Sequence, residues 1–194
     1  MNDTPLIARS PELMSADDTA LLVVDVQEKL VPAIHGHARL VFNIRRLIDG
    51  AKVLGLPVIG TEQYPRGLGP TVAELAGRLG PLPEKLTFSG AGCPEVFGPL
   101  VERGLTKILV TGVEAHVCVQ QTVFDLLGGG WRVYLALDAV GSRHRIDYRT
   151  ALRRMDSGGA VLTTTEAALF EWCRVAGTGE FKAISRLVRE EPPE

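Results

Sequence analysis

The chain has 194 residues, 45% of them hydrophobic, and this size and composition suit one globular domain with a sizeable core. Its formal net charge is −2 and its basic residues are scattered, so a nucleic-acid-binding face is not expected. No apolar run reaches the roughly 18 residues of a membrane span. The N-terminus also lacks the basic and apolar regions of a secretory signal. The three cysteines include no C-x-x-C pair, which favours reduced thiols and a cytoplasmic location.

Apolar runs and helical periodicities alternate along the chain. The first run, at 20–26, is almost continuously apolar, as expected of a strand that is buried on both faces. Glycines and prolines separate most of the segments that follow. In chain order, we predict a strand at 20–26, a helix at 40–54, a strand at 58–59, a helix at 71–79, a weak extended segment at 85–89, a helix at 94–103, a strand at 107–110, a helix at 117–127, a strand at 132–137, a helix at 146–157, a strand at 160–162, and helices at 166–175 and 181–188.

This alternation predicts an α/β fold, a three-layer sandwich around a doubly wound, mostly parallel sheet of about six strands in a Rossmann-like order. We find no linker or repeat, so residues 1–194 are expected to form one domain. Its core would cover about 19–176, with a C-terminal helix and tail at 177–194. By composition, the first ~15 residues and the tail at 190–194 are expected to be loose.

Three reactive side chains fall near the ends of predicted strands. Asp25 lies at the end of the first strand and Lys85 lies in the weak extended segment. Cys118 follows the strand at 107–110, which Thr111 and Gly112 are expected to break. Open parallel sheets bind ligands at the carboxyl ends of their strands, so the three residues are expected to meet in one crevice.

Each of these residues has a chemical and a structural interpretation. Amides at a helix N-terminus would favour the Cys118 thiolate, the form that acts as a nucleophile, but a free cysteine can also be a small core residue. Asp25 would act as a general base or as an ion-pair partner at a strand end. Lys85 would lower the thiol pKa or would be an ordinary solvated surface residue.

The segments LVVDVQ (22–27), EKLTFS (84–89) and GVEAHVCV (112–119) together resemble the three signatures of the isochorismatase-like cysteine hydrolases. The resemblance covers about 19–172, and the EQYP run at 62–65 is most similar to the subgroup of isochorismatase domain-containing proteins. It implies an isochorismatase-like fold and a catalytic triad of Asp25, Lys85 and Cys118.

The resemblance also implies a cis peptide bond between Val113 and Glu114. The backbone amides of Glu114 and Cys118 would then form an oxyanion hole. We place Gln63, Tyr64 and His116 in the substrate pocket on weaker grounds, because His116 could equally brace the loop through a backbone hydrogen bond.

One departure from the family bears on cofactors. Nicotinamidases of this family hold a metal ion through an Asp-x-His pair and a later histidine, and the corresponding segment here, 60–65, has no histidine. Glu62 alone cannot form a closed metal site. We therefore expect no metal ion and no other cofactor.

The resemblance and this departure together indicate a metal-independent cysteine hydrolase that cleaves a small amide or related acyl compound through a thioester. True isochorismatases commonly lack the cysteine, so cleavage of a vinyl ether is not expected. The alternatives are a non-catalytic interaction or assembly module and, less well supported without a nearby resolving cysteine, a thiol redox protein. The expected partners are a small-molecule substrate and further copies of the chain in a homo-oligomer, with no nucleic acid and no membrane.

Overall fold

A parallel β-sheet of six strands forms the centre of the computed structural model, which describes residues 7–193. The strand order is β3-β2-β1-β4-β5-β6, and every neighbouring pair is parallel. The predicted doubly wound α/β sheet with a Rossmann-like order is therefore confirmed. The strands are β1 (Thr19–Val24), β2 (Val58–Gln63), β3 (Glu84–Lys85), β4 (Lys107–Val113), β5 (Arg132–Gly141) and β6 (Val161–Thr163).

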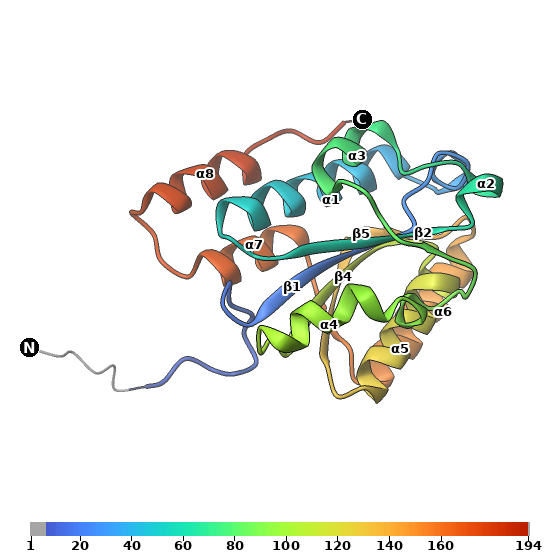
Figure 1. The fold of residues 1–194 in the computed structure, drawn as a ribbon. Coiled ribbons are helices and arrows are strands. Elements are labelled where there is room, and N and C mark those ends of the chain that lie inside the picture. Colours follow the sequence, from blue (N-terminus) through green and yellow to red (C-terminus); the bar gives the residue numbers. More distant parts are fainter. Residues whose placement is uncertain (1–6, 194) are drawn as a thin grey trace, which may run out of the picture.

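Helices cover both faces of the sheet, so the molecule has the three layers that were predicted (Figure 1). Within residues 7–193, the α-helices are α1 (His37–Val53), α2 (Pro65–Leu68), α3 (Ala73–Leu79), α4 (Pro94–Glu102), α5 (Gln120–Gly128), α6 (Arg145–Ser157), α7 (Thr165–Cys173) and α8 (Gly179–Val188). One layer holds α1, α3, α7 and α8, and the opposite layer holds α4, α5 and α6. A π-helical turn, Ala115–Val119, leads from β4 into α5.

The central strands are buried on both faces because their side chains alternate between two hydrophobic cores. In β1, Leu21 and Val23 belong to the core under α1, whereas Leu22 and Val24 belong to the core under α4, α5 and α6. Every residue of β1 and of β4 is buried. The continuous apolar runs in the sequence are a direct consequence of this double burial.

The predicted break at Thr111 and Gly112 is wrong, because β4 continues through both residues to Val113. Gly112 has a φ of +116°, and a Cβ atom built on it would lie 2.0 Å from the backbone oxygen of Val24. The glycine is therefore needed for the close approach of β4 to β1, and it does not end the strand.

The first strand ends two residues earlier than predicted, at Val24. Asp25 has a φ of +51°, which is a left-handed conformation that few residues other than glycine adopt. Its backbone amide still donates a hydrogen bond to the Thr61 oxygen of β2, at 3.1 Å. Asp25 therefore sits at the carboxyl edge of the sheet, where the chain turns out of β1.

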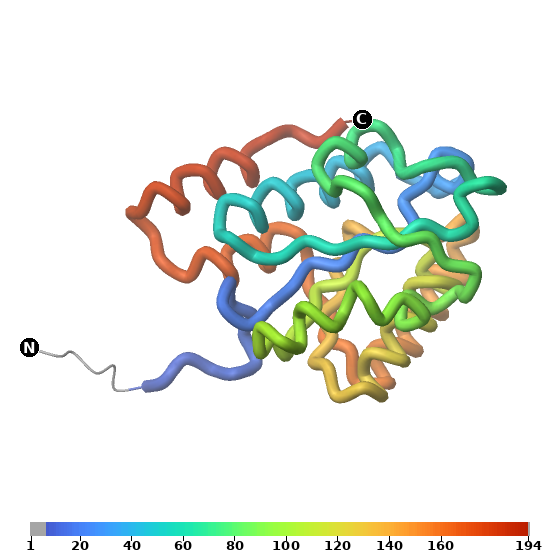
Figure 2. Tube along the Cα trace, viewed as in Figure 1, coloured from blue at the N-terminus to red at the C-terminus, as the bar shows by residue number. Residues whose placement is uncertain are grey.

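A few contacts anchor the segments at both ends of the described chain, although residues 7–13 and 191–193 are exposed, as composition suggested. Met14 is fully buried, and its amide donates a 2.8 Å hydrogen bond to the Glu171 carboxylate. The segment after α8 runs back along α1, where Glu190 forms an ion pair with Arg45 (Figure 2). Residues 1–6 and 194, which were also expected to be loose, lie outside the described part of the chain. None of the helices within 7–193 is long and apolar enough to cross a bilayer.

Candidate active site

Asp25, Lys85 and Cys118 are placed by adjacent elements at the carboxyl edge of the sheet. Asp25 follows β1, Lys85 ends β3, and Cys118 lies in the π-helical turn after β4. The register pairs Lys85 with Gln63, the last residue of β2. Since β2 and β4 both flank β1, this register brings the three segments together around Asp25.

Asp25 and Lys85 form a buried ion pair. The Lys85 Nζ atom lies 2.6 Å from Asp25 Oδ2, and the two side chains are 1% and 0% exposed. Lys85 Nζ also donates to Gln63 Oε1 at 2.7 Å and to the Phe88 backbone oxygen at 2.9 Å, while Thr61 Oγ1 donates to Asp25 Oδ1 at 2.8 Å. Such a pair tolerates burial because the three ammonium hydrogens and both carboxylate oxygens have hydrogen-bond partners.

The Cys118 thiol meets this pair at the side chain of Gln63. Its Sγ atom lies 4.0 Å from Gln63 Oε1, the same oxygen that accepts from Lys85. Cys118 is 5% exposed, so the thiol is buried in an almost closed site. The acid, the amine and the thiol that the sequence places far apart therefore share one cluster.

The thiol pKa differs from the sequence-based expectation. Burial is the main cause, followed by the charge of Asp25, and together they raise the pKa of Cys118 to about 12, although Lys85 acts in the opposite direction. The expectation of a lowered thiol pKa is therefore wrong. Burial also raises the pKa of Asp25, against the opposing effects of Lys85 and of the hydrogen bonds to the carboxylate. A protonated thiol thus lies beside a carboxylate that is more basic than usual.

The raised thiol pKa predicts a pH dependence of stability. Because the pKa of Cys118 is higher in the folded protein than its ordinary value of 9.0, the stabilisation it contributes is complete below pH 9 and is lost as the pH rises towards 12. Between pH 9 and 11, we expect the free energy of unfolding to fall by about 2 kcal/mol more in the unmodified protein than in Cys118→Ala. Urea denaturation at each pH measures this difference. Parallel pH curves for the two proteins would show that the thiol titrates normally.

Gln63 was predicted as a pocket residue, and it has the densest set of contacts in the cluster. Besides its bonds to Lys85 and Cys118, its Nε2 donates to the Leu86 backbone oxygen at 3.0 Å. Its backbone is held on both sides by Gln27, whose Oε1 accepts from Gln63 N at 2.8 Å and whose Nε2 donates to Gln63 O at 3.0 Å. Gln27 is fully buried and fixes the position of β2 beside the ion pair.

Glu114 and His116 are held by the loop between β5 and α6. The Val113–Glu114 peptide bond is cis, and no hydrogen-bond acceptor for the Glu114 amide is found among residues 7–193. The Glu114 carboxylate accepts from the Arg143 backbone amide at 3.0 Å and from Arg143 Nε at 3.1 Å. His116 Nδ1 lies 3.0 Å from Ser142 Oγ, so this histidine braces the loop through a side chain and not through a backbone bond.

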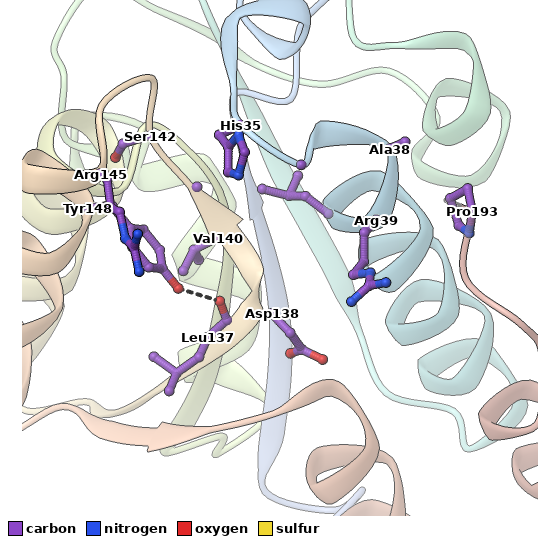
Figure 3. Close-up of a pocket in the computed structure, with 13 residues that line it drawn as sticks. His35, Ala38, Arg39, Leu137, Asp138, Val140, Ser142, Arg145, Tyr148 and Pro193 are labelled. Atoms are coloured by element: carbon purple, nitrogen blue, oxygen red, sulfur yellow. Dashed lines mark hydrogen bonds between the residues drawn. The ribbon is translucent and has the colours of Figure 1, made fainter.

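Part of this loop lines a cavity of about 640 Å³ (Figure 3). It opens between the start of α1, the end of β5 and α6, and Tyr148 donates a hydrogen bond to Leu137 O on its wall at 2.8 Å. Ser142 belongs to this wall, whereas Asp25, Lys85 and Cys118 do not. The cavity thus offers a competing hydroxyl nucleophile beside a histidine, and an activity assay has to separate Ser142 from Cys118.

Sequence reasoning did not identify Gln27, Thr61, Ser142 or Arg143 as parts of the site. Gln27 follows the apolar run of β1 and Thr61 lies within β2, so the burial of these polar residues with a partner was a usable signal. Arg143 and Ser142 gave no such signal, because their roles depend on how the loop after β5 folds over the loop after β4. Glu62, the residue considered for a metal, accepts from the amide and the hydroxyl of Thr71, both at 2.6 Å.

Comparison with known proteins gives consistent matches over most of the chain. The family model described as "Isochorismatase domain" matches residues 19–167. Isochorismatase domain-containing protein 2 of Danio rerio is 37% identical over 182 residues, which cover 93% of this chain and 92% of that protein. Isochorismatase domain-containing protein 1 of the same species is 35% identical over 93% of this chain, but the match covers only 64% of its own length, less than two thirds.

Among solved structures, one titled MAR1 ribonuclease from Caenorhabditis elegans superposes with a TM-score of 0.87. It is 36% identical in sequence, and the match covers 94% of this chain and 95% of that chain. The whole three-layer fold therefore recurs in that protein.

Proposed function

This chain belongs to the isochorismatase family, and on that basis we propose that it is a hydrolase that uses Cys118 to cleave small amides or related acyl compounds. Membership of the family supports hydrolysis in general. The observation that carries the more specific proposal is the shared contact at Gln63, where the Cys118 thiol lies next to the Asp25–Lys85 pair. No metal ion takes part in the steps that we propose.

The proposed first step joins the sulfur to the substrate carbon. Because the thiol pKa is about 12, Cys118 stays protonated until it attacks, and Asp25 takes the proton as the carbon–sulfur bond forms. Asp25 then gives this proton to the substrate nitrogen while the carbon–nitrogen bond breaks and ammonia or an amine leaves. The product of this half-reaction is a thioester on Cys118.

The second step regenerates the enzyme. A water molecule transfers one proton to Asp25 and adds to the thioester carbon. The carbon–sulfur bond breaks, the acid leaves, and the proton returns from Asp25 to the sulfur. Burial makes Asp25 a better proton acceptor, and Lys85 keeps its carboxylate in place through the 2.6 Å contact.

Both steps pass through an oxyanion, for which we propose the backbone amides of Glu114 and Cys118 as donors. The Glu114 amide is a suitable donor because we find no competing acceptor for it within residues 7–193. Arg143 would act as a positioning residue, since it binds the Glu114 carboxylate, which is itself nearly buried. Preorganised donors of this kind stabilise the negative charge that develops in the transition state.

Two other functions were weighed against this proposal. A non-catalytic module would not need a buried ion pair whose hydrogen bonds converge on a thiol. The solved relative called a ribonuclease raises RNA as a second candidate substrate, because it is 36% identical to this chain. The net charge of −2 argues against RNA as the substrate, since binding of the phosphate backbone relies on basic residues.

The proposal is tested by measuring ammonia release from a panel of small uncharged amides, with an RNA oligonucleotide as a parallel substrate. We expect at least one amide to release ammonia, and we expect prior alkylation of Cys118 with iodoacetamide to stop the release. Alkylation should be confirmed on the tryptic peptide 108–132, whose one cysteine is Cys118. Cleavage of RNA by the alkylated protein, with no amide turnover before alkylation, would refute the proposal.

The predicted homo-oligomer, small-molecule partner and cytoplasmic location stay predictions. Light scattering would give the number of copies in solution, and the same experiment on the alkylated protein would show whether assembly depends on the active site.

A further inference from the structure

Three large apolar side chains are exposed on the two segments that carry Gln63 and Lys85. Tyr64 is 50% exposed, Leu86 is 77% exposed and Phe88 is 53% exposed. Tyr64 directly follows Gln63, and the other two come one and three residues after Lys85. We call these three side chains the apolar rim. Grouped apolar exposure next to a reactive centre is typical of a ligand-binding surface.

Hydrogen bonds to the catalytic cluster hold the backbone of the apolar rim in place. The Tyr64 amide donates to the Lys85 oxygen at 3.0 Å. Gln63 Nε2 donates to the Leu86 oxygen at 3.0 Å, and Lys85 Nζ donates to the Phe88 oxygen at 2.9 Å. The polar groups of these residues therefore face the cluster, and their apolar side chains remain in contact with solvent.

The two positive charges within the cluster itself, Lys85 and Arg143, are already paired with carboxylates. The Lys85 ammonium has three hydrogens, and Asp25, Gln63 and the Phe88 oxygen accept them. The Arg143 guanidinium is paired with Glu114. A substrate carboxylate would therefore lose its hydration beside two ion pairs without gaining a free cation from either pair.

From these observations we propose that the apolar rim binds the uncharged, apolar body of the substrate, so that the enzyme acts on neutral amides of apolar acids in preference to anionic ones. This inference rests on the proposed function, because it assigns the substrate class of the same site. The rim residues would determine specificity without taking part in bond making.

The preference can be measured without knowing the substrate, by alkylating Cys118 with three reagents of different character. These are N-benzyliodoacetamide, which is neutral with an apolar body, iodoacetamide, which is small and neutral, and iodoacetate, which is an anion. Each rate is followed by mass spectrometry on the peptide 108–132 and divided by the rate of N-acetylcysteine with the same reagent at the same pH. This division removes the intrinsic reactivity of the reagent, and the thiol pKa affects all three ratios equally.

Relative to iodoacetamide, we expect the normalised rate to be about tenfold higher for N-benzyliodoacetamide and about tenfold lower for iodoacetate. The double variant Leu86→Ala, Phe88→Ala should lose the advantage of the benzyl group and keep its rate with iodoacetamide. Val175→Ala is the matched control, because Val175 is similarly exposed, at 63%, and follows α7 on the opposite face of the sheet. It should change neither ratio.

The outcomes separate this inference from the proposed function. Equal normalised rates for the three reagents, or a benzyl advantage that persists in the double variant, would refute the proposal that the apolar rim binds the substrate body. Neither result would refute amide hydrolysis by Cys118. Absence of ammonia release from every amide would remove the proposed function, whatever the reagents showed.

Discussion

Replacing Cys118 with alanine is expected to lower amide hydrolysis at least ~10⁴-fold, because the substitution removes the atom that forms the covalent bond to the substrate. The alanine leaves the Asp25–Lys85 pair and its hydrogen bonds to Thr61 and Gln63 intact, so the folded structure should persist. Ammonia release by the purified variant, compared with the unmodified protein, measures the effect.

The matched control is Ser142→Ala, which removes the hydroxyl that lies beside His116 in the loop between β5 and α6. Ser142 braces His116 at 3.0 Å, so we expect its loss to reduce the rate by no more than about tenfold. If Ser142→Ala abolished turnover and Cys118→Ala retained it, the reaction would belong to the cavity in Figure 3 and the assignment of the nucleophile would be wrong.

Replacing Lys85 with methionine is expected to destabilise the protein by about 3–5 kcal/mol, because it leaves the Asp25 carboxylate buried without its counter-charge. The side chains of both residues are at most 1% exposed, so solvent cannot replace the lost contact without a rearrangement. Urea denaturation measures the change in the free energy of unfolding, with the same m-value used for the variant and the unmodified protein.

The same variant should show a characteristic pH dependence. Without Lys85, the pKa of Asp25 in the folded state rises further, so folding favours the protonated acid and stability falls as the pH increases. The deficit relative to the unmodified protein should therefore grow between roughly pH 5 and 8. The double variant Asp25→Asn, Lys85→Met carries no buried charge and should recover part of the stability. A deficit below about 1 kcal/mol at every pH would mean that the pair is not buried in solution.

The fold was largely predictable because its strands are buried on both faces. The β1 strand is buried at every position and apolar from Ala20 to Val24, and few structures other than a central parallel strand require this. The error at Gly112 has a physical origin, since a glycine that permits close contact between strands is indistinguishable in sequence from one that ends a strand. Only the position of Val24 O, 2.0 Å from the site of a Cβ atom, separates the two cases.

The approximate meeting of Asp25, Lys85 and Cys118 was also predictable, since parallel strands bring their carboxyl ends to one edge. The role of Gln63 was not, because it depends on the register that sets Gln63 beside Lys85. The pKa of the thiol was predicted in the wrong direction. A helix N-terminus is visible in sequence, whereas the depth of burial that outweighs it is a property of the folded chain.

The central claim is that the acyl group of the substrate is transferred to Cys118. The most direct test uses an amide that the enzyme hydrolyses: the reaction is quenched rapidly with acid during turnover, and the intact mass of the enzyme is measured. The account predicts a transient mass increase equal to the acyl group, located on the tryptic peptide 108–132 and absent from Cys118→Ala. Steady turnover with no adduct on that peptide, or an adduct on the serine at position 142, would contradict it.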